Sequence, residues 1–275
     1  MSLLYVVLGV IVTFVVFKFV GTAAGFILVA LMLIYGIYHF IPSYYIIKGN
    51  KAYAAGDDEA SCMWYKKAYD TGRTKVETKT SYAYILMRTG NADEAEKVLD
   101  TIIRVRGLDP KKKNLAKQQR CMVYYRQGRL DEALEEAYEL YNNGYKTSNL
   151  YSMLGYFKQL NNAPLDETLQ ICEEAYEYDD ENRDILDNLS VCYYKLGRYE
   201  DAERISDKLL QKNTEFVEGC YHGAQIALKT GNKDKARKCI EMLQNCKRSG
   251  MTTVTEEEIK KITDEVRGNE NTARG

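Results

Sequence analysis

The stretch GRYEDAERISDKLL, Gly197–Leu210, opens with a glycine, two variable residues, a carboxylate, a second charged residue and an alanine. The same order begins three other segments of the chain: GNADEAEKVLDTI from Gly90, GRLDEALEEAYEL from Gly128 and GNKDKARKCIEML from Gly231. A motif that returns several times along one chain indicates an internal structural repeat.

The repeat is about 34 residues long. Successive turn positions are 34, 38, 34, 35 and 34 residues apart. These positions are Gly56, Gly90, Gly128, Asn162, Gly197 and Gly231. Glycine and asparagine tolerate the left-handed conformation that ends a helix, and carboxylates favour the positive end of the helix that follows. Each turn position therefore predicts the turn between two helices.

Three further columns follow the same period. Seven residues before each turn position the chain has a small residue: Gly49, Ala83, Cys121, Gly155, Ser190 and Ala224. Five residues after it, allowing one inserted residue near Pro164, stand Ser61, Ala95, Ala133, Thr168, Ala202 and Ala236. Seven residues further on stand Ala68, Ile102, Leu140, Ala175, Leu209 and Leu243. Small residues allow two helices to cross closely, and the last column predicts core contacts.

With these columns, residues 42 to 250 resemble the tetratricopeptide repeat family. The resemblance implies an all-α fold, a right-handed superhelical solenoid of about six helical hairpins. The family's usual Trp in the first helix and its common Pro after the second are absent. Four extra residues precede Gly128, within or near RGLDPKKKN, and we expect a longer turn or a lengthened helix there. The run Lys111–Lys113 is expected to be a solvated loop.

The N-terminal segment has a different character. Residues 3 to 47 carry one charge, Lys18, and one helix of that length would be about twice the ~30 Å hydrocarbon thickness of a bilayer. We therefore expect a transmembrane helical hairpin, a membrane anchor at 1–47 with spans at 3–20 and 26–47, joined by GTAAG. A cleaved signal peptide and a single tilted span are the alternatives.

Beyond the anchor, the solenoid is expected at 48–250 and a capping helix with a tail at 251–275. Thr255 and Glu258 form a capping-box pattern, and Gly268 is the expected end of that helix. Lysines that follow the second span place the repeats in the cytoplasm, at a bacterial-type inner (plasma) membrane, because positive charge stays on that side.

Composition excludes few functions. The chain has 38 Lys and Arg against 39 Asp and Glu, with no pooled basic surface, so nucleic acid is not an expected partner. Seven cysteines without a C-x-x-C pair and only two histidines indicate neither a disulfide framework nor a metal site. No cofactor is expected.

The resemblance implies that the first helix of each hairpin lines a concave groove. The inward positions are Tyr53, Tyr84, Met87, Arg88, Met122, Tyr125, Arg126, Tyr156, Gln159, Tyr194, Lys195, Tyr221, Gln225 and Lys229. Aromatic rings beside basic residues suit an extended acidic or amphipathic peptide. The carboxylate clamp of chaperone-binding relatives is not expected, since its positions hold Ile46, Thr80, Gln118, Ser152, Asp187 and Tyr221.

These features favour a membrane-anchored scaffold that binds partner proteins or peptides and is not an enzyme. One alternative is a regulator gated by a short peptide. Another is an enzyme subunit with a cysteine nucleophile, but Cys220 and His222, two residues apart on one helix, point in different directions. The sequence does not indicate the partner's identity or the oligomeric state.

Overall fold

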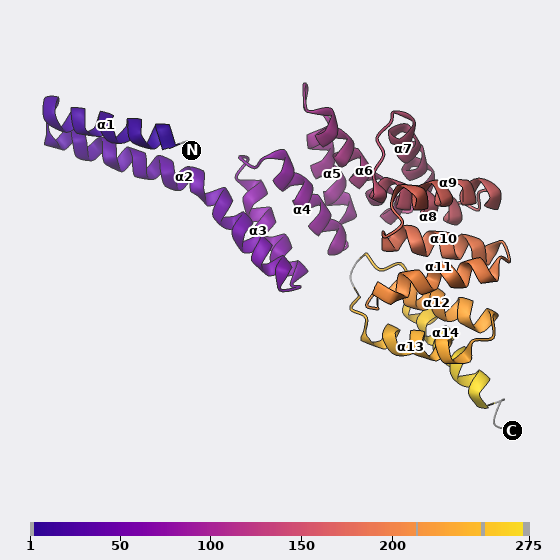
Figure 1. Ribbon diagram of the computed structural model, residues 1–275. Coiled ribbons are helices and arrows are strands. Elements are labelled where there is room, and N and C mark those ends of the chain that lie inside the picture. Colours follow the sequence, from indigo (N-terminus) through magenta and orange to yellow (C-terminus); the bar gives the residue numbers. More distant parts are fainter. Residues whose placement is uncertain (1–2, 213, 249–250, 272–275) are drawn as a thin grey trace. The chain divides into compact units, whose positions relative to one another are not determined.

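The computed structural model describes residues 3–212, 214–248 and 251–271, and within them it contains fourteen α-helices and no strand (Figure 1). The helices belong to two compact units, Met1–Tyr82 and Ala83–Gly275, which are taken in turn below. The all-α prediction is confirmed.

The N-terminal unit begins with two helices in an antiparallel hairpin. Its helices are α1 (Leu3–Phe19), α2 (Thr22–Ala54), α3 (Asp58–Asp70) and the first half of α4 (Val76–Arg88). The rings of Phe17 and Phe26 meet across the hairpin with centroids 5.3 Å apart. Thr13 lies opposite Met32, with a hydroxyl–sulfur distance of 3.4 Å.

The connection in this hairpin is shorter than predicted. Only Val20 and Gly21 lie between α1 and α2, whereas the sequence suggested Gly21–Gly25. Gly21, at φ 128°, makes the reversal in a conformation that other residues rarely adopt. Gly25 is already helical, and a Cβ there would lie 2.4 Å from the ring of Phe17, so its role is close helix packing.

The second apolar helix does not end at Ile47. Every other hairpin except the third has a first helix of 13 residues that ends two residues before its turn position. Counted back from Gly56, the same register begins at Pro42, inside α2. The first helix of the first hairpin is therefore a continuation of the apolar helix, because a fall in hydropathy alone does not break a helix.

Hairpins then follow one another to α13. The remaining helices are α5 (Ala92–Ile103), α6 (Pro110–Arg126), α7 (Leu130–Asn142), α8 (Ser148–Leu160), α9 (Leu165–Tyr178), α10 (Arg183–Lys195), α11 (Tyr199–Lys212), α12 (Val217–Lys229), α13 (Lys233–Asn245) and α14 (Glu256–Asn271). All six turn positions have positive φ, from 50° at Asn162 to 78° at Gly90 and Gly231. Six hairpins are present, as predicted from the period.

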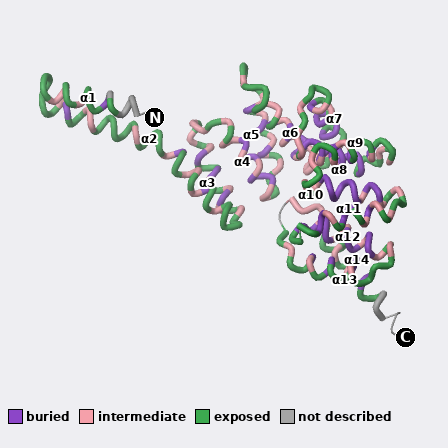
Figure 2. The backbone as a smooth tube through the Cα atoms, in the orientation of Figure 1, coloured by how far each residue is buried: buried purple, intermediate pink, exposed green. Residues whose placement is uncertain are grey.

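The predicted columns form the core between helices. Figure 2 shows the buried residues as purple segments. Every residue of the column five after the turn has no exposed surface: Ser61, Ala95, Ala133, Thr168, Ala202 and Ala236. The column of small residues seven before the turn is buried throughout, and the third column is no more than 2% exposed. The small side chains thus stand where paired helices approach most closely.

The four extra residues before Gly128 lengthen α6, which has 17 residues instead of 13. Asp109 caps this helix by accepting a hydrogen bond from the Lys111 backbone N–H at 2.9 Å, and Pro110 occupies the first helical position. Lys111–Lys113 therefore form its first turn, not the loop that was predicted. A capping aspartate followed by proline is a helix start, which outweighs the turn character of GLDP.

The C-terminal helix α14 begins with the predicted capping box. The backbone N–H of Glu258 donates to the Thr255 hydroxyl, and the backbone N–H of Thr255 donates to the Glu258 carboxylate. Ile262 and Val266 are buried against α12 and α13. The helix does not stop at Gly268 but continues to Asn271.

We expect Ala133→Leu to lower the free energy of unfolding by about 1–3 kcal/mol, because the added methyl groups must enter a fully packed crossing. Urea unfolding of the full chain in detergent, followed by the helical signal near 222 nm, measures the change. Glu135→Leu places the same side chain on the exposed side of α7 and should change stability by at most about 0.5 kcal/mol. Equal losses in both variants would contradict the packing role of this column.

Candidate functional site

The first helices of successive hairpins contact one another directly. Asn188 of α10 donates to the backbone carbonyl of Ser152 in α8 at 2.7 Å, and Gln159 of α8 donates to the carbonyl of Asn188 at 3.0 Å. These two bonds use side-chain amides to hold neighbouring first helices at a fixed spacing. They form the frame on which the inner side chains are placed.

Two of the predicted groove tyrosines form a pair. The hydroxyls of Tyr125 in α6 and Tyr156 in α8 are 2.8 Å apart, and their rings meet edge to face at 5.4 Å. Burial raises the pKa of Tyr156, and the hydrogen bond with Tyr125 adds to the effect. The pair is a fixed polar contact between two repeats, with both rings partly exposed.

Other predicted residues make contacts mostly within their own repeat. Arg88 lies 3.5 Å from the Tyr84 hydroxyl, and Gln225 donates to the Tyr221 hydroxyl at 2.9 Å. Tyr194 packs on Tyr199 of the following helix, and the exposed Lys229 lies 5.4 Å from the centre of the Tyr199 ring. Tyr53 lies on α2 in the N-terminal unit and is 41% exposed. Met122 and Arg126 are half-buried, and Lys195 is exposed.

Two predicted groove residues are not accessible. Met87 is 3% exposed and Gln159 is 9% exposed. The amide of Gln159 already bonds to the Asn188 carbonyl. The mapping is wrong at these positions, because both side chains pack between helices and do not reach the surface.

The structure adds acidic residues and a histidine that the mapping missed. His222 of α12 reaches back to Asp187 of α10, with Nδ1 at 2.9 and 3.0 Å from the two carboxylate oxygens. Burial opposes a charge on His222, but the Asp187 carboxylate outweighs it and raises the pKa of the imidazole. Glu218 on α12 and Asp184 on α10 lie close by. We call Tyr125, Tyr156, Asp184, Asp187, Glu218, Tyr221 and His222 the inner face.

A sequence signal for part of this cluster existed. Asp187 stood at a position where the carboxylate clamp has another residue, and His222 is adjacent to Tyr221, the equivalent position one repeat of 34 residues later. Cys220 does not join the cluster: it is fully buried, its Sγ lies 3.6 Å from the Thr214 carbonyl, and burial raises its thiol pKa. Cys220 and His222 therefore have different partners.

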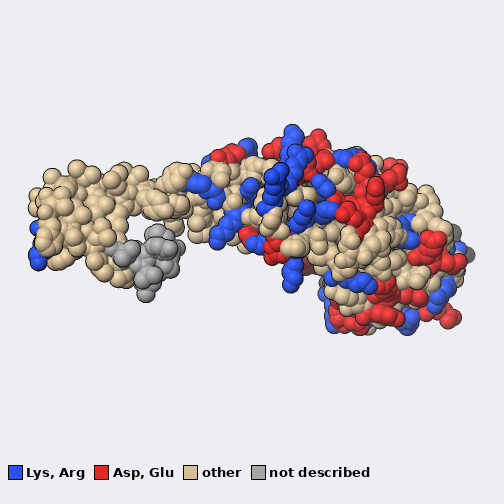
Figure 3. Space-filling view, turned by 90° about the horizontal axis from the view of Figure 1, so that it is seen from above, with Lys and Arg blue, Asp and Glu red and all other residues tan. Residues whose placement is uncertain are grey.

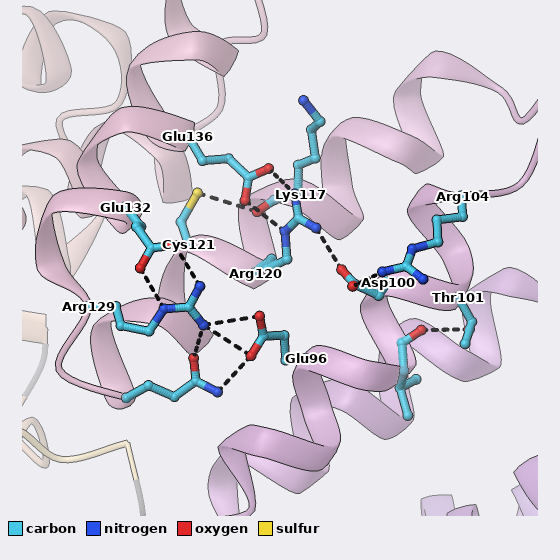
Figure 4. A network of polar contacts seen from close by, with 12 residues as sticks. Glu96, Asp100, Thr101, Arg104, Lys117, Arg120, Cys121, Arg129, Glu132 and Glu136 are labelled. Carbon is cyan, nitrogen blue, oxygen red and sulfur yellow. Dashed lines mark hydrogen bonds and ion pairs between the residues drawn. The ribbon is translucent and has the colours of Figure 1, made fainter.

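Charged side chains join the second and third hairpins outside the inner face (Figure 4). Arg120 of α6 bonds at 2.6 Å to Asp100 of α5 and at 2.6 Å to Glu136 of α7. A second arginine, Arg129, reaches Glu96 of α5 at 3.1 Å. Side-chain hydrogen bonds and the charge of Glu136 raise the pKa of Arg120. The charged guanidinium of Arg120 thus stabilises the contact between the two repeats.

A similar group of side-chain hydrogen bonds joins the third and fourth hairpins. The carboxylate of Glu174 in α9 accepts hydrogen bonds from Tyr141 of α7 and Tyr151 of α8, each at 2.6 Å. Lys146 contributes a third contact at 2.9 Å. The bond from Tyr141, followed by those from Tyr151 and Lys146, lowers the pKa of Glu174 to about 2. The carboxylate is therefore ionised at every pH at which the protein is expected to work.

The N-terminal unit has a group of aromatic and cation–aromatic contacts where its apolar hairpin ends. Pro42 has no N–H, so the carbonyl of Tyr38 lacks its helical donor. The guanidinium of Arg73, which follows α3, donates to that carbonyl and lies 3.4 Å from the centre of the Tyr38 ring. Trp64 of α3 stacks on Tyr45, with centroids 5.9 Å apart.

Cations surround these rings. Lys67 lies 4.5 Å from the centre of the Trp64 ring, and Lys48 lies 5.7 Å from that of Tyr44. We call this set the aromatic belt: Tyr38, Tyr44, Tyr45, Trp64, Lys48, Lys67 and Arg73. Within the described residues, α2 is the single helix long and apolar enough to cross a membrane, and Gly9–Phe19 is a shorter apolar helix beside it.

Comparison with known proteins bears on the repeats. A tetratricopeptide repeat model matches residues 165–216, and a second tetratricopeptide repeat model matches residues 119–137. The chain is a tetratricopeptide repeat protein. The search of curated protein sequences returned no match.

Solved structures share the fold of this tetratricopeptide repeat chain. PilF of Pseudomonas aeruginosa is 14% identical with a TM-score of 0.58, covering 83% of this chain and 99% of PilF. A tetratricopeptide repeat protein from Parabacteroides merdae is 15% identical with a TM-score of 0.56, covering 84% of this chain and 87% of its own. A thermophilic repeat protein of Thermus thermophilus is 15% identical with a TM-score of 0.54, covering 70% and 98%. At these identities the likeness concerns the fold.

Arg120→Met should lower the free energy of unfolding by about 3 kcal/mol, because it leaves the buried Glu136 carboxylate without its cation. Arg104 bonds to the same Asp100, but its side chain is 80% exposed, so Arg104→Met should cost at most about 0.5 kcal/mol. Urea unfolding of both variants checks the difference. A loss at Arg120 no larger than at Arg104 would mean that the network does not join the repeats.

Proposed function

We propose that this protein is a membrane-anchored scaffold whose tetratricopeptide repeats bind partner proteins. One observation carries the membrane part: large apolar side chains are exposed on the hairpin of α1 and α2. They include Val10, Ile11, Phe14, Phe26, Leu31, Ile34, Ile37 and Phe40, each more than 50% exposed. Figure 3 shows this hairpin without charged residues except at its tip. An exposed apolar surface of this kind is typical of a segment that contacts lipid.

The dimensions of the hairpin support the proposal. The 17 residues of α1 extend about 25 Å at 1.5 Å per residue, close to the ~30 Å of a hydrocarbon core. The pairing of Phe17 with Phe26 and of Thr13 with Met32 brings the start of α1 level with about residue 40 of α2. The apolar part of α2 thus has the length that one crossing needs, and α1 covers most of the same thickness beside it.

The aromatic belt suits the membrane–water boundary at the level of about residue 40 of α2. Tyrosine and tryptophan favour the headgroup region, where the ring is shielded and the polar end stays hydrated. Lysine and arginine beside them attract anionic headgroups. The belt therefore supports a boundary near Tyr38, earlier in the chain than the Ile47 limit expected from the sequence, with Pro42 onward belonging to the repeats.

Charge asymmetry supports the cytoplasmic placement of the repeats. Lys18 is the one cation at the tip of the hairpin, whereas Lys48 and Lys51 lie near the end of α2 and Lys66, Lys67 and Arg73 follow it closely. Positive charges near a span stay on the cytoplasmic side. A hairpin with two crossings leaves both chain ends on that side.

The interaction role rests on the fold and the inner face. Repeat solenoids expose an extended surface built by the first helices, and partners usually bind there. Here that surface carries partly exposed rings at Tyr84, Tyr125, Tyr156, Tyr194 and Tyr221. Aromatic side chains supply large contact areas at low entropic cost, which suits a protein partner.

Thr22→Cys at the tip of the hairpin and Lys260→Cys on α14 test the topology, since both positions are exposed. We expect a membrane-impermeant maleimide to label Thr22→Cys in intact cells, and Lys260→Cys only after permeabilisation. The two sites should differ because two crossings separate the tip from the repeats.

The unaltered chain measures labelling of the native thiols and is subtracted. Intact mass should also show that α1 stays attached. Labelling of Lys260→Cys from outside would contradict the cytoplasmic placement, and loss of α1 from the mature chain would mean that a signal peptide had been removed.

A further inference from the structure

The connection between α13 and α14 is folded onto the first helix of the last repeat. Arg248 and Glu256 form an ion pair that brings the two ends of this connection together. Between them, the backbone N–H of Thr253 donates to Glu218 at 2.8 Å, and the Thr253 hydroxyl lies 3.2 Å from the same oxygen. Val254 packs against the core of α12. Residues 251–255 are therefore held against α12 (Figure 1).

The same segment reaches the inner face two repeats away. The side chain of Thr253 also lies near Tyr156, the tyrosine of α8 that pairs with Tyr125. Thr253 thus bonds to Glu218 of α12 and lies near Tyr156 of α8. Farther along, Glu258 and Glu265 of α14 lie close enough to Tyr221 to affect its ionisation. The chain's own C-terminal arm, residues 251–271, therefore lies beside Tyr156 and Tyr221, which the sequence assigned to partner binding.

The chemistry of this contact identifies what the surface accepts. Glu218 takes a main-chain N–H from a segment that has no helix or strand structure. Asp184 lies near Glu218 and Asp187, and the neighbouring Arg183 is stacked 4.7 Å from the centre of the Phe216 ring. Asp187 is already paired with His222. The remaining carboxylates favour a ligand that brings N–H groups and positive charge.

At this site the arm supplies the N–H group that the surface accepts but not the positive charge. Its segment 251–255, MTTVT, supplies the N–H and the hydroxyl at Thr253 but no cation. A peptide with the same backbone N–H at this place and with flanking basic residues would make the same contact with Glu218 and would add an attraction to Asp184. This differs from the acidic or amphipathic ligand expected from the sequence, because Asp184 and Glu218 were not in the mapped set.

We propose that the inner face at α8, α10 and α12 binds an extended basic segment of a partner protein, and that residues 251–255 occupy part of this site until the partner displaces them. The inference rests on the proposed scaffold function and specifies its ligand. The arm then acts as an internal competitor: partner affinity falls by the fraction of molecules in which the arm is seated.

The test uses the full chain in detergent and two fluorescent peptides. One copies residues 251–255 between pairs of lysines, and the other has glutamates in place of the lysines. We expect the lysine peptide to bind and the glutamate peptide not to bind. Thr253→Pro, which removes the N–H donated to Glu218, should bind the lysine peptide about 10-fold more tightly if the arm is seated in about nine molecules of ten.

Two further variants separate the arm from the site. Thr253→Val keeps the N–H and loses the hydroxyl, so its gain should fall between those of the unaltered chain and Thr253→Pro. Asp184→Asn combined with Thr253→Pro should lose several-fold in affinity for the lysine peptide, because it removes a charge without contacting the arm. Helical signal and melting temperature are measured on every variant.

Hydrogen exchange supplies a readout that needs no variant. Adding the lysine peptide to the unaltered chain should speed amide exchange in residues 251–255. Equal affinity in the unaltered chain and Thr253→Pro, unchanged exchange in 251–255, or equal binding of the two peptides would each overturn the inference. The scaffold function would still stand if partners cross-link to Tyr84 on α4, which the arm does not contact in this account.

Discussion

Close approach of paired helices is the constraint on which this structure depends. Ala95, Ala133 and Ala202 have no exposed surface, and Ser61 and Thr168 take the same place in weaker repeats. A hairpin that crosses at this distance cannot cover its other apolar side alone, so it must stack on the next hairpin. Stacking in turn aligns the first helices, and the bonds between Gln159, Asn188 and Ser152 then hold them side by side.

Much of this could be read from the sequence because it is periodic. Turn positions and the three columns recur with the repeat, and each was found where the period placed it. The capping box at Thr255 was found from its own local pattern. The same reasoning found the apolar hairpin but not its limits. Helix α2 passes through the change in hydropathy at Ile47, and Pro42 marks the start of the repeat register.

The polar contacts between repeats could not be predicted. Arg120 with Glu136, Asp187 with His222 and Glu218 with Thr253 join residues 16 to 35 positions apart that belong to no shared motif. Their pairing depends on how far one helix slides along another, which the repeat pattern does not specify. The groove mapping failed at Met87 for a related reason, since a one-position rotation moves a side chain from the surface into the core.

Different surfaces of the chain suit the membrane and the partner. Apolar side chains around α1 and α2 suit lipid, while the inner face of the later first helices offers rings and carboxylates to a partner. The C-terminal arm has two roles in this account. It covers the last hairpin through Ile262 and Val266, and through Thr253 it takes up part of the surface that a partner would use.

Site-specific photo-cross-linking in native membranes tests the central claim, that partners bind the side formed by the first helices. A photoreactive phenylalanine analogue is placed at Tyr84 or Tyr194 on that side, and at the exposed Lys238 of α13 as the matched outer position. The account predicts that illumination joins other proteins to the chain from Tyr84 and Tyr194 and not from Lys238. Adducts from Lys238 alone, or from none of the three, would contradict it.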